Sequence, residues 1–204
     1  MLLENLYNNY KDMLRMKDMI LKTKDELIKI IKNDQCMMEI LQTVSLLNLP
    51  DWWISAGFVR NKIWDVIHDY KDRTEYNDID VIYFDPSNLE ETIEKEYENQ
   101  LKKVRPGIPW SVKNQARMHL RNRTVSYESS IDAVNHYPEC PTAIYIKLCN
   151  DEVLVHYDYN FEELFEGTVK PTPYFIKSEK KNVYLNRIKE KDWFKTWPKL
   201  KIYK

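Results

Sequence analysis

The sequence predicts an α+β (mixed α/β) fold in which helices come first and a short mixed sheet flanked by helices follows. Three observations predict this class. Apolar residues recur at helical spacing through residues 1–48, and Leu49-Pro50 ends that pattern. Residues 78–84 alternate acidic and apolar side chains and then become wholly apolar, as expected of a half-buried strand. Residues 143–157 have the pattern of a β-hairpin, so we expect the helices to pack on a small sheet.

The same reasoning assigns the other elements in chain order. We expect helices over residues 1–33, 35–48, 58–68, 89–103, 129–136 and 161–165, and strands over residues 52–54, 78–84, 110–114, 143–148 and 152–157. A chain of 204 residues is typical of one domain. We divide it into a helical N-terminal part (1–48), a core of sheet and helices (52–148) and a C-terminal extension (149–204).

Composition narrows the classes of partner. The 31 basic and 32 acidic residues give a net charge of −1, so no overall field favours a long polyanion or an anionic membrane. The three cysteines are odd in number and lack CxxC spacing, which is typical of a reducing compartment. No signal peptide or membrane-spanning stretch is visible in the sequence, so we expect a cytoplasmic protein.

Residues 54–85 carry the strongest functional pattern. A strand end is followed by Gly57, an amphipathic helix, a polar loop and a strand that holds Asp78 and Asp80. A glycine at a strand-to-helix turn lets a ligand approach the backbone, and the helix start offers free N–H groups to an anion. Two carboxylates at positions i and i+2 of a strand point the same way and suit a divalent cation. Arg60 lies in the first helical turn, where its guanidinium could hold a phosphate, although a surface ion pair is the simpler reading of an isolated arginine.

These motifs resemble a known family. The segment AGFVRN (56–61) followed by DID (78–80) is similar to the head motif of the polymerase-β-like nucleotidyltransferase superfamily, in particular that of CCA-adding and poly(A) polymerases. The longer runs LPDWWISAGFVRNKIWD, NDIDVIYFD, WSVKNQARMH, YPECPTAI and WPKL resemble a family of small bacterial nucleotidyltransferase-like proteins. The resemblance implies a nucleotidyltransferase-like sheet with the metal aspartates on its second strand. It implies transfer of an NMP from an NTP to a hydroxyl, with Mg²⁺ or Mn²⁺ as cofactor.

The resemblance also implies roles for individual residues. Asp78 and Asp80 would be the catalytic metal ligands, and the turn at Gly57 would seat the triphosphate. The expected substrate-binding residues are Ser55, Gly57, Arg60, Asn61 and Asn114. Asn114 stands where the superfamily commonly has a third carboxylate, and it cannot act as a base for the attacking hydroxyl. Asp132 or Asp158 could supply that carboxylate from elsewhere.

The sequence also departs from the superfamily pattern at the turn. Ala56 replaces the first glycine of the usual pair, and Phe58 replaces a small residue, which narrows the room for phosphate. Three readings therefore stay open: a metal-dependent nucleotidyltransferase, a catalytically reduced nucleotide-binding module, and a structural or interaction protein. The balanced charge favours a small molecule or a protein over nucleic acid as acceptor.

Other conspicuous residues have simpler interpretations. We expect His119 to be a hydrogen-bonded structural histidine and Asp85 to be a turn residue rather than a third ligand. Trp193 and Trp197, four residues apart, could stack on a base, but core or lid packing is the better interpretation.

Overall fold

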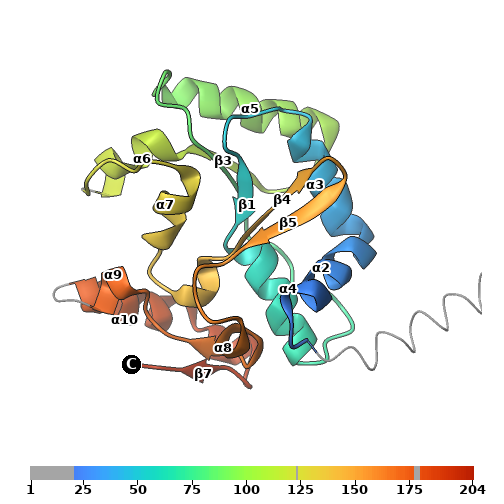
Figure 1. The fold of residues 1–204 in the computed structure, drawn as a ribbon, viewed down its shortest axis with the longest axis vertical. Coiled ribbons are helices and arrows are strands. Elements are labelled where there is room, and N and C mark those ends of the chain that lie inside the picture. Colours follow the sequence, from blue (N-terminus) through green and yellow to red (C-terminus); the bar gives the residue numbers. More distant parts are fainter. Residues whose placement is uncertain (1–20, 123, 177–179) are drawn as a thin grey trace, which may run out of the picture.

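The computed structural model describes residues 21–122, 124–176 and 180–204. Its centre is a mixed sheet of five strands in the order β3-β2-β1-β4-β5, with helices packed on both faces (Figure 1). This arrangement confirms the predicted fold class. The strands are β1 (Trp53–Ser55), β2 (Ile79–Tyr83), β3 (Trp110–Asn114), β4 (Tyr145–Cys149) and β5 (Glu152–His156).

The main hydrophobic core lies between one face of the sheet, residues of the C-terminal segment and four helices. They are α2 (Lys24–Asn33), α3 (Gln35–Ser45), α4 (Gly57–Ile67) and α5 (Glu91–Val104). Helix α2 begins with a capping box in which Thr23 and Glu26 satisfy each other's backbone N–H groups. The predicted helices over 35–48, 58–68 and 89–103 correspond to α3, α4 and α5, whereas residues 1–20 of the first predicted helix lie outside the described part.

Two short helices cover the other face, α6 (Gln115–Asn122) and α7 (Ser130–Asn135). Helix α7 was expected, and the Ser129 side chain accepts the hydrogen bond from the Asp132 N–H that caps it. Helix α6 was not expected. It continues from β3 without a linker, and its sequence QARMHLRN has too few apolar residues to show a helical stripe.

The C-terminal part adds a second layer below the sheet in Figure 1. It contains α8 (Phe161–Phe165), β6 (Thr168–Val169), α9 (Pro173–Ile176), α10 (Lys181–Lys191), α11 (Trp193–Thr196) and β7 (Lys201–Ile202), and β6 pairs with β7 in parallel. Trp193 and Trp197 pack edge-on against Trp64 of α4, with ring centroids 5.2 and 5.0 Å away. Their predicted packing role is therefore confirmed. Within the described segments, we find no helix with the length and apolarity needed to cross a bilayer.

Candidate functional site

Three polar side chains form a row across the central strands. Ser55 of β1 lies opposite Asp80 of the antiparallel β2, and Asp80 lies beside Ser111 of the parallel β3. Paired residues of neighbouring strands project to the same face. The next row consists of residues that are fully buried in the main core, Ile54, Val81 and Val112. The strict alternation of β2 therefore delivers Asp80 to the face that carries α6 and α7.

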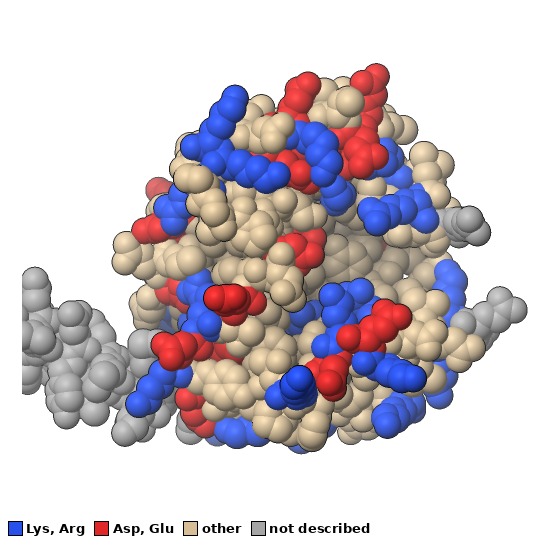
Figure 2. Space-filling view, turned by 180° about the vertical axis from the view of Figure 1, so that it is seen from behind, with Lys and Arg blue, Asp and Glu red and all other residues tan. Residues whose placement is uncertain are grey.

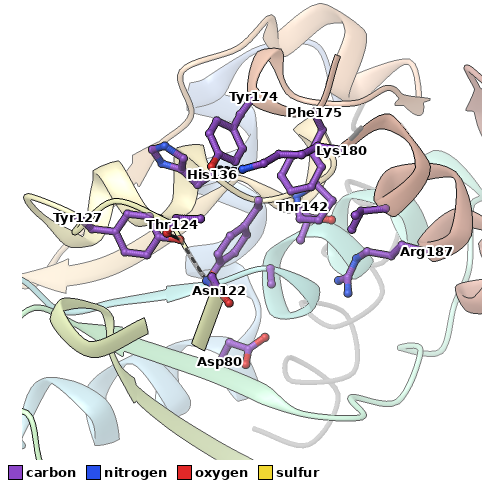
Figure 3. Close-up of a pocket in the computed structure, with 14 residues that line it drawn as sticks. Asp80, Asn122, Thr124, Tyr127, His136, Thr142, Tyr174, Phe175, Lys180 and Arg187 are labelled. Carbon is purple, nitrogen blue, oxygen red and sulfur yellow. Dashed lines mark hydrogen bonds between the residues drawn. The ribbon is translucent and has the colours of Figure 1, made fainter. Parts of the chain in front are cut away.

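Asp80 lies in a cleft with a volume of about 420 Å³, within the usual range for small-molecule sites. Figure 3 shows Asp80 on one side of the cleft, with Tyr174, Lys180 and Arg187 on the others. The walls come from the turn between β1 and α4, the segment joining α6 to α7, residues 136–142 after α7, and helices α9 and α10. The space-filling view shows a face hollowed near its centre, with acidic and basic side chains mixed around the hollow (Figure 2).

The two predicted metal ligands lie next to each other at the start of β2. Asp78 is exposed and immediately precedes the strand, whereas Asp80 is mostly buried. Burial and the negative charge of Asp78 raise the pKa of Asp80 to about 6, against a hydrogen bond from Ser111 and the positive charges of Arg60 and Arg187. A cation bound between the two carboxylates would offset both the burial of the Asp80 charge and its repulsion by Asp78. Two carboxylates are also the protein ligands that Mg²⁺ commonly uses beside phosphate oxygens and water, so the donor set fits a divalent cation.

A third carboxylate does not join this pair. In the described segments, no three His, Cys, Asp or Glu side chains gather closely enough to hold a metal ion. Asp132 instead accepts a hydrogen bond from the Glu128 N–H in front of α7. Asp158 is paired with His156 at 2.6 Å between Oδ1 and Nε2.

Asn114 has a structural position that the sequence did not reveal. It pairs with Tyr83, three residues along β3 from Ser111, and therefore lies roughly 10 Å along the strand from the row that contains Asp80. Its amide oxygen accepts from the N–H groups of Asp85 and Ala116, and its amide nitrogen donates to the carbonyls of Asp85 and Asn88. These four bonds use the whole capacity of an asparagine side chain. The structure therefore does not bring Asn114 to the cleft.

Asp85 and His119 also occupy the structural positions expected of them. The Asp85 carboxylate accepts hydrogen bonds from the N–H and hydroxyl of Ser87, which closes a turn. The Nδ1 of His119 lies 3.0 Å from the Ala116 carbonyl oxygen within α6. Neither residue is a candidate ligand.

The strand-to-helix turn is strained at the residue that replaces a glycine. Ala56 has φ 57° and ψ −125°, a backbone conformation in which a side chain is costly. Gly57, by contrast, does not have a positive φ, and a methyl group there would meet its nearest neighbour, Arg60 Nη2, at an ordinary 3.6 Å. The backbone geometry of the turn therefore does not itself require glycine at position 57. No side chain caps α4, so its first N–H groups face the turn without such a partner.

Arg60 and Asn61 are both buried beneath the turn. Arg60 is 8% exposed, donates to Thr142 Oγ1 at 2.9 Å and to Asn61 Oδ1 at 3.1 Å, and lies over the rings of Trp64 and Trp193. Burial lowers the pKa of Arg60 to about 10, so it remains charged at neutral pH. Its guanidinium acts on Asp80 through the electrostatic field rather than by opening into the cleft.

Several residues of the cleft escaped the sequence analysis. Tyr137 lies 3.3 Å from the Ser55 hydroxyl, and burial together with the charge of Asp80 raises the pKa of Tyr137, which keeps it protonated. His136 has Nδ1 2.8 Å from the Asp132 carbonyl oxygen and packs between the rings of Tyr127 and Tyr174. Because a carbonyl only accepts, Nδ1 carries the proton.

Of two other cleft residues, Thr142 and Arg187, only Thr142 had a partial signal in the sequence. Thr142, like Tyr137, falls in the run YPECPTAI, which marked the family without indicating that it turns into the cleft. Arg187 lies on α10, which no sequence motif linked to the aspartates.

Comparison with known proteins shows the family to which the chain belongs. Residues 42–202 match a protein family described as nucleotidyltransferase. The chain belongs to this nucleotidyltransferase family. A solution structure described as revealing a CCA-adding enzyme head domain is 33% identical, with a TM-score of 0.81 over 91% of this chain and 98% of the other. The predicted resemblance is therefore confirmed. No curated protein matches the chain.

More distant nucleotidyltransferases share the fold. A CCA-adding enzyme in complex with CTP is 14% identical, with a TM-score of 0.55, and covers 91% of this chain. The Thermotoga maritima CCA-adding enzyme complexed with tRNA is 15% identical, with a TM-score of 0.54, and covers 86% of this chain. The matched part spans 44% and 42% of those two enzymes. Family and fold together support nucleotidyl transfer as the general activity.

Proposed function

We propose that this family member is a metal-dependent nucleotidyltransferase that moves an NMP from an NTP to a hydroxyl of a small molecule or a protein. The observation that carries the proposal is the position of Asp80. It lies in a cleft of nucleotide size, beside Asp78 and next to a helix start that no side chain caps. Nucleotide phosphates bind to carboxylate-held cations and to free backbone N–H groups, and both are available at this position.

The residues divide the work by their chemistry. Asp78 and Asp80 hold Mg²⁺ or Mn²⁺, which when bound neutralises phosphate charge and polarises the reacting oxygens. The first N–H groups of α4, at Gly57, seat the triphosphate, with Ser55 and the protonated Tyr137 as neighbouring hydroxyl groups. The acceptor hydroxyl gives up its proton to solvent as its oxygen bonds to the α-phosphorus, and the bond to the leaving pyrophosphate breaks.

Asn61 acts indirectly in this scheme. Its amide oxygen accepts from Arg60, and both side chains lie behind the turn rather than in front of it. We propose that the pair supports the triphosphate seat from behind, with the buried positive charge of Arg60 favouring an anion at the turn.

A second candidate function is a nucleotide-binding module with reduced catalytic power. The observation that favours it is the missing third carboxylate among the described residues, since the superfamily commonly uses one to activate the attacking hydroxyl. Such a module would bind an NTP with the same aspartates and turn. It would release no pyrophosphate.

We propose a small-molecule or protein acceptor because the described residues on the face drawn in Figure 2 form no continuous basic surface for a polyanion. The net charge is −1, and Figure 2 shows acidic and basic side chains interspersed on the face that carries the hollow. The Thermotoga maritima enzyme, which is complexed with tRNA, is more than twice as long as its part that matches this chain.

The test measures NTP binding and turnover with each of the four NTPs and Mg²⁺. Pyrophosphate release and the mass of the protein are followed together, so that self-modification is detected. The double variant Asp78→Asn with Asp80→Asn should lose metal-dependent NTP binding and remain folded. The matched control is Asp72→Asn with Glu75→Gln, which removes two exposed charges from the preceding loop. Unchanged NTP binding in the aspartate variant would sink the proposal, and binding without pyrophosphate release from any candidate acceptor would favour the second candidate.

A further inference from the structure

A buried carboxylate links the head motif to the C-terminal helix. Glu139, in the connection after α7, is fully buried, and its Oε1 lies 2.6 Å from Nε of Arg187 on α10. The contact is an ion pair by distance, but its N–H bond is misaligned for a hydrogen bond. The field of Glu139 also acts on Arg60. Two arginines thus face one buried carboxylate, so the second positive charge is balanced only by the aspartates of the cleft.

The two arginines differ in how many of their N–H groups are free to bind a ligand. Both terminal nitrogens of Arg60 are hydrogen-bonded, and its faces are covered by two tryptophan rings. The side chain of Arg187 is 36% exposed and lines the cleft. Within the described segments, neither of its terminal nitrogens has a hydrogen-bond partner. Figure 3 shows Arg187 and Asp80 on different sides of the same cleft, and their charges interact.

We propose that Arg187, held by Glu139, is the phosphate-binding arginine of this cleft, and that its ligand is the polyphosphate chain of the nucleotide. The inference rests on the proposed function, since it places the chain between Arg187 and a cation on Asp78 and Asp80. The charges agree with this arrangement. A divalent cation cancels the two aspartates, and the uncompensated arginine charge then attracts an anion. The planar guanidinium offers two terminal N–H donors in the geometry that phosphate accepts.

Glu139 is a positioning residue in this arrangement. It contacts Arg187 through Nε, the nitrogen nearest the aliphatic stem, and so fixes the side chain while the outer end stays open. A buried carboxylate without its cation is strongly unfavourable, which means that Arg187→Gln alone can destabilise the fold. The double variant Arg187→Gln with Glu139→Gln removes both charges and leaves a neutral pair of similar shape. It is therefore the decisive variant.

The experiment is calorimetric titration with inorganic tripolyphosphate and with NTPs, each in Mg²⁺. The wild type should bind both, and Arg187→Gln and the double variant should each bind tripolyphosphate about 10- to 100-fold more weakly. Arg187→Lys should recover part of the loss because it restores a charge without the planar donors. Lys189→Ala, which removes an exposed charge from the same helix, is the matched control and should bind like the wild type.

Each other outcome overturns a defined part of the scheme. Wild-type affinity in Arg187→Gln, with binding still lost in the aspartate variant, rejects the role of Arg187 and leaves the proposed function standing. Recovery of affinity in the double variant shows that Arg187 only shields Glu139, and this also rejects the inference. A wild type that binds no triphosphate rejects both the inference and the proposed function. Thermal unfolding of every variant shows which losses reflect the fold.

Discussion

Replacing Asp80 with asparagine is expected to stabilise the metal-free protein at neutral pH, although we propose that Asp80 is needed for function. Burial and the charge of Asp78 raise the pKa of Asp80 from an ordinary 3.8 to about 6. At about 1.4 kcal/mol per pKa unit, the ionised carboxylate costs the folded state roughly 3 kcal/mol at pH 7. Asparagine keeps the shape of the side chain and can still accept the Ser111 hydrogen bond, but it carries no charge.

The sign of the pH dependence follows from the two pKa values. The folded protein retains the Asp80 proton up to about pH 6, whereas the unfolded chain releases it near 3.8. The wild type therefore loses stability as the pH rises through this window, and the loss is complete above about pH 6. The advantage of Asp80→Asn should grow from little below about pH 4 to roughly 3 kcal/mol near pH 7. For a chain of this size, that difference raises Tm by roughly 6–12 °C.

The assay is urea unfolding in a metal chelator at several pH values between 4 and 7.5, with the free energy of unfolding compared at each pH. Asp72→Asn, an exposed aspartate in the loop before β2, is the control and should follow the wild type throughout. Adding Mg²⁺ should stabilise the wild type and leave Asp80→Asn unchanged. A variant that is no more stable than the wild type, or whose advantage is the same at every pH, would refute the electrostatic reasoning.

Three further substitutions test other parts of the structure. Ala56→Gly should stabilise the fold by about 1 kcal/mol, because relief of backbone strain exceeds the entropy cost of glycine; unchanged or lower stability in urea unfolding would contradict the strained turn. Asp65→Ala should cost about 3 kcal/mol, because it leaves Trp197 Nε1 and two donors of Thr74 without their acceptor; a Tm drop of only 1–2 °C would count against that network. Asn114→Ala should lower the free energy of unfolding by roughly 2–4 kcal/mol yet leave the Kd of the folded protein for Mg-NTP unchanged. A loss of affinity without a loss of stability would show that Asn114 contributes to the binding site.

The sequence was most informative where a local period decides the structure. Alternation in NDIDVIYFD places Asp80 and Val81 on opposite faces of β2, and the structure shows that arrangement. Helical spacing in the residues after Gly57 likewise identified α4. Such a pattern depends only on which face of a single helix or strand is buried. It can therefore be predicted from the sequence of that segment alone.

The sequence was least informative where partners come from distant segments. Asn114 had the right chemistry and strand for a ligand, but its role is decided by the backbone of residues 85–88, which bends back over the end of β3. Arg60 occupies the expected position in the motif, yet its burial depends on Trp193, far along the chain. The positive φ at Ala56 rather than Gly57 reflects the geometry of the whole strand-to-helix connection, which composition alone does not specify.

Helix α4 connects these observations, because its C-terminal end anchors the C-terminal segment. Asp65 of this helix accepts a hydrogen bond from Trp197 Nε1 at 2.9 Å, and His68, the residue that follows its last turn, accepts at Nε2 from the Lys199 N–H at 2.8 Å. The same helix begins at the uncapped turn beside Asp80. The segment that contains α10 is therefore fastened to the helix whose N-terminus faces the cleft. We therefore expect the WPKL tail, through this anchoring, to help position Arg187 across the cleft from Asp80.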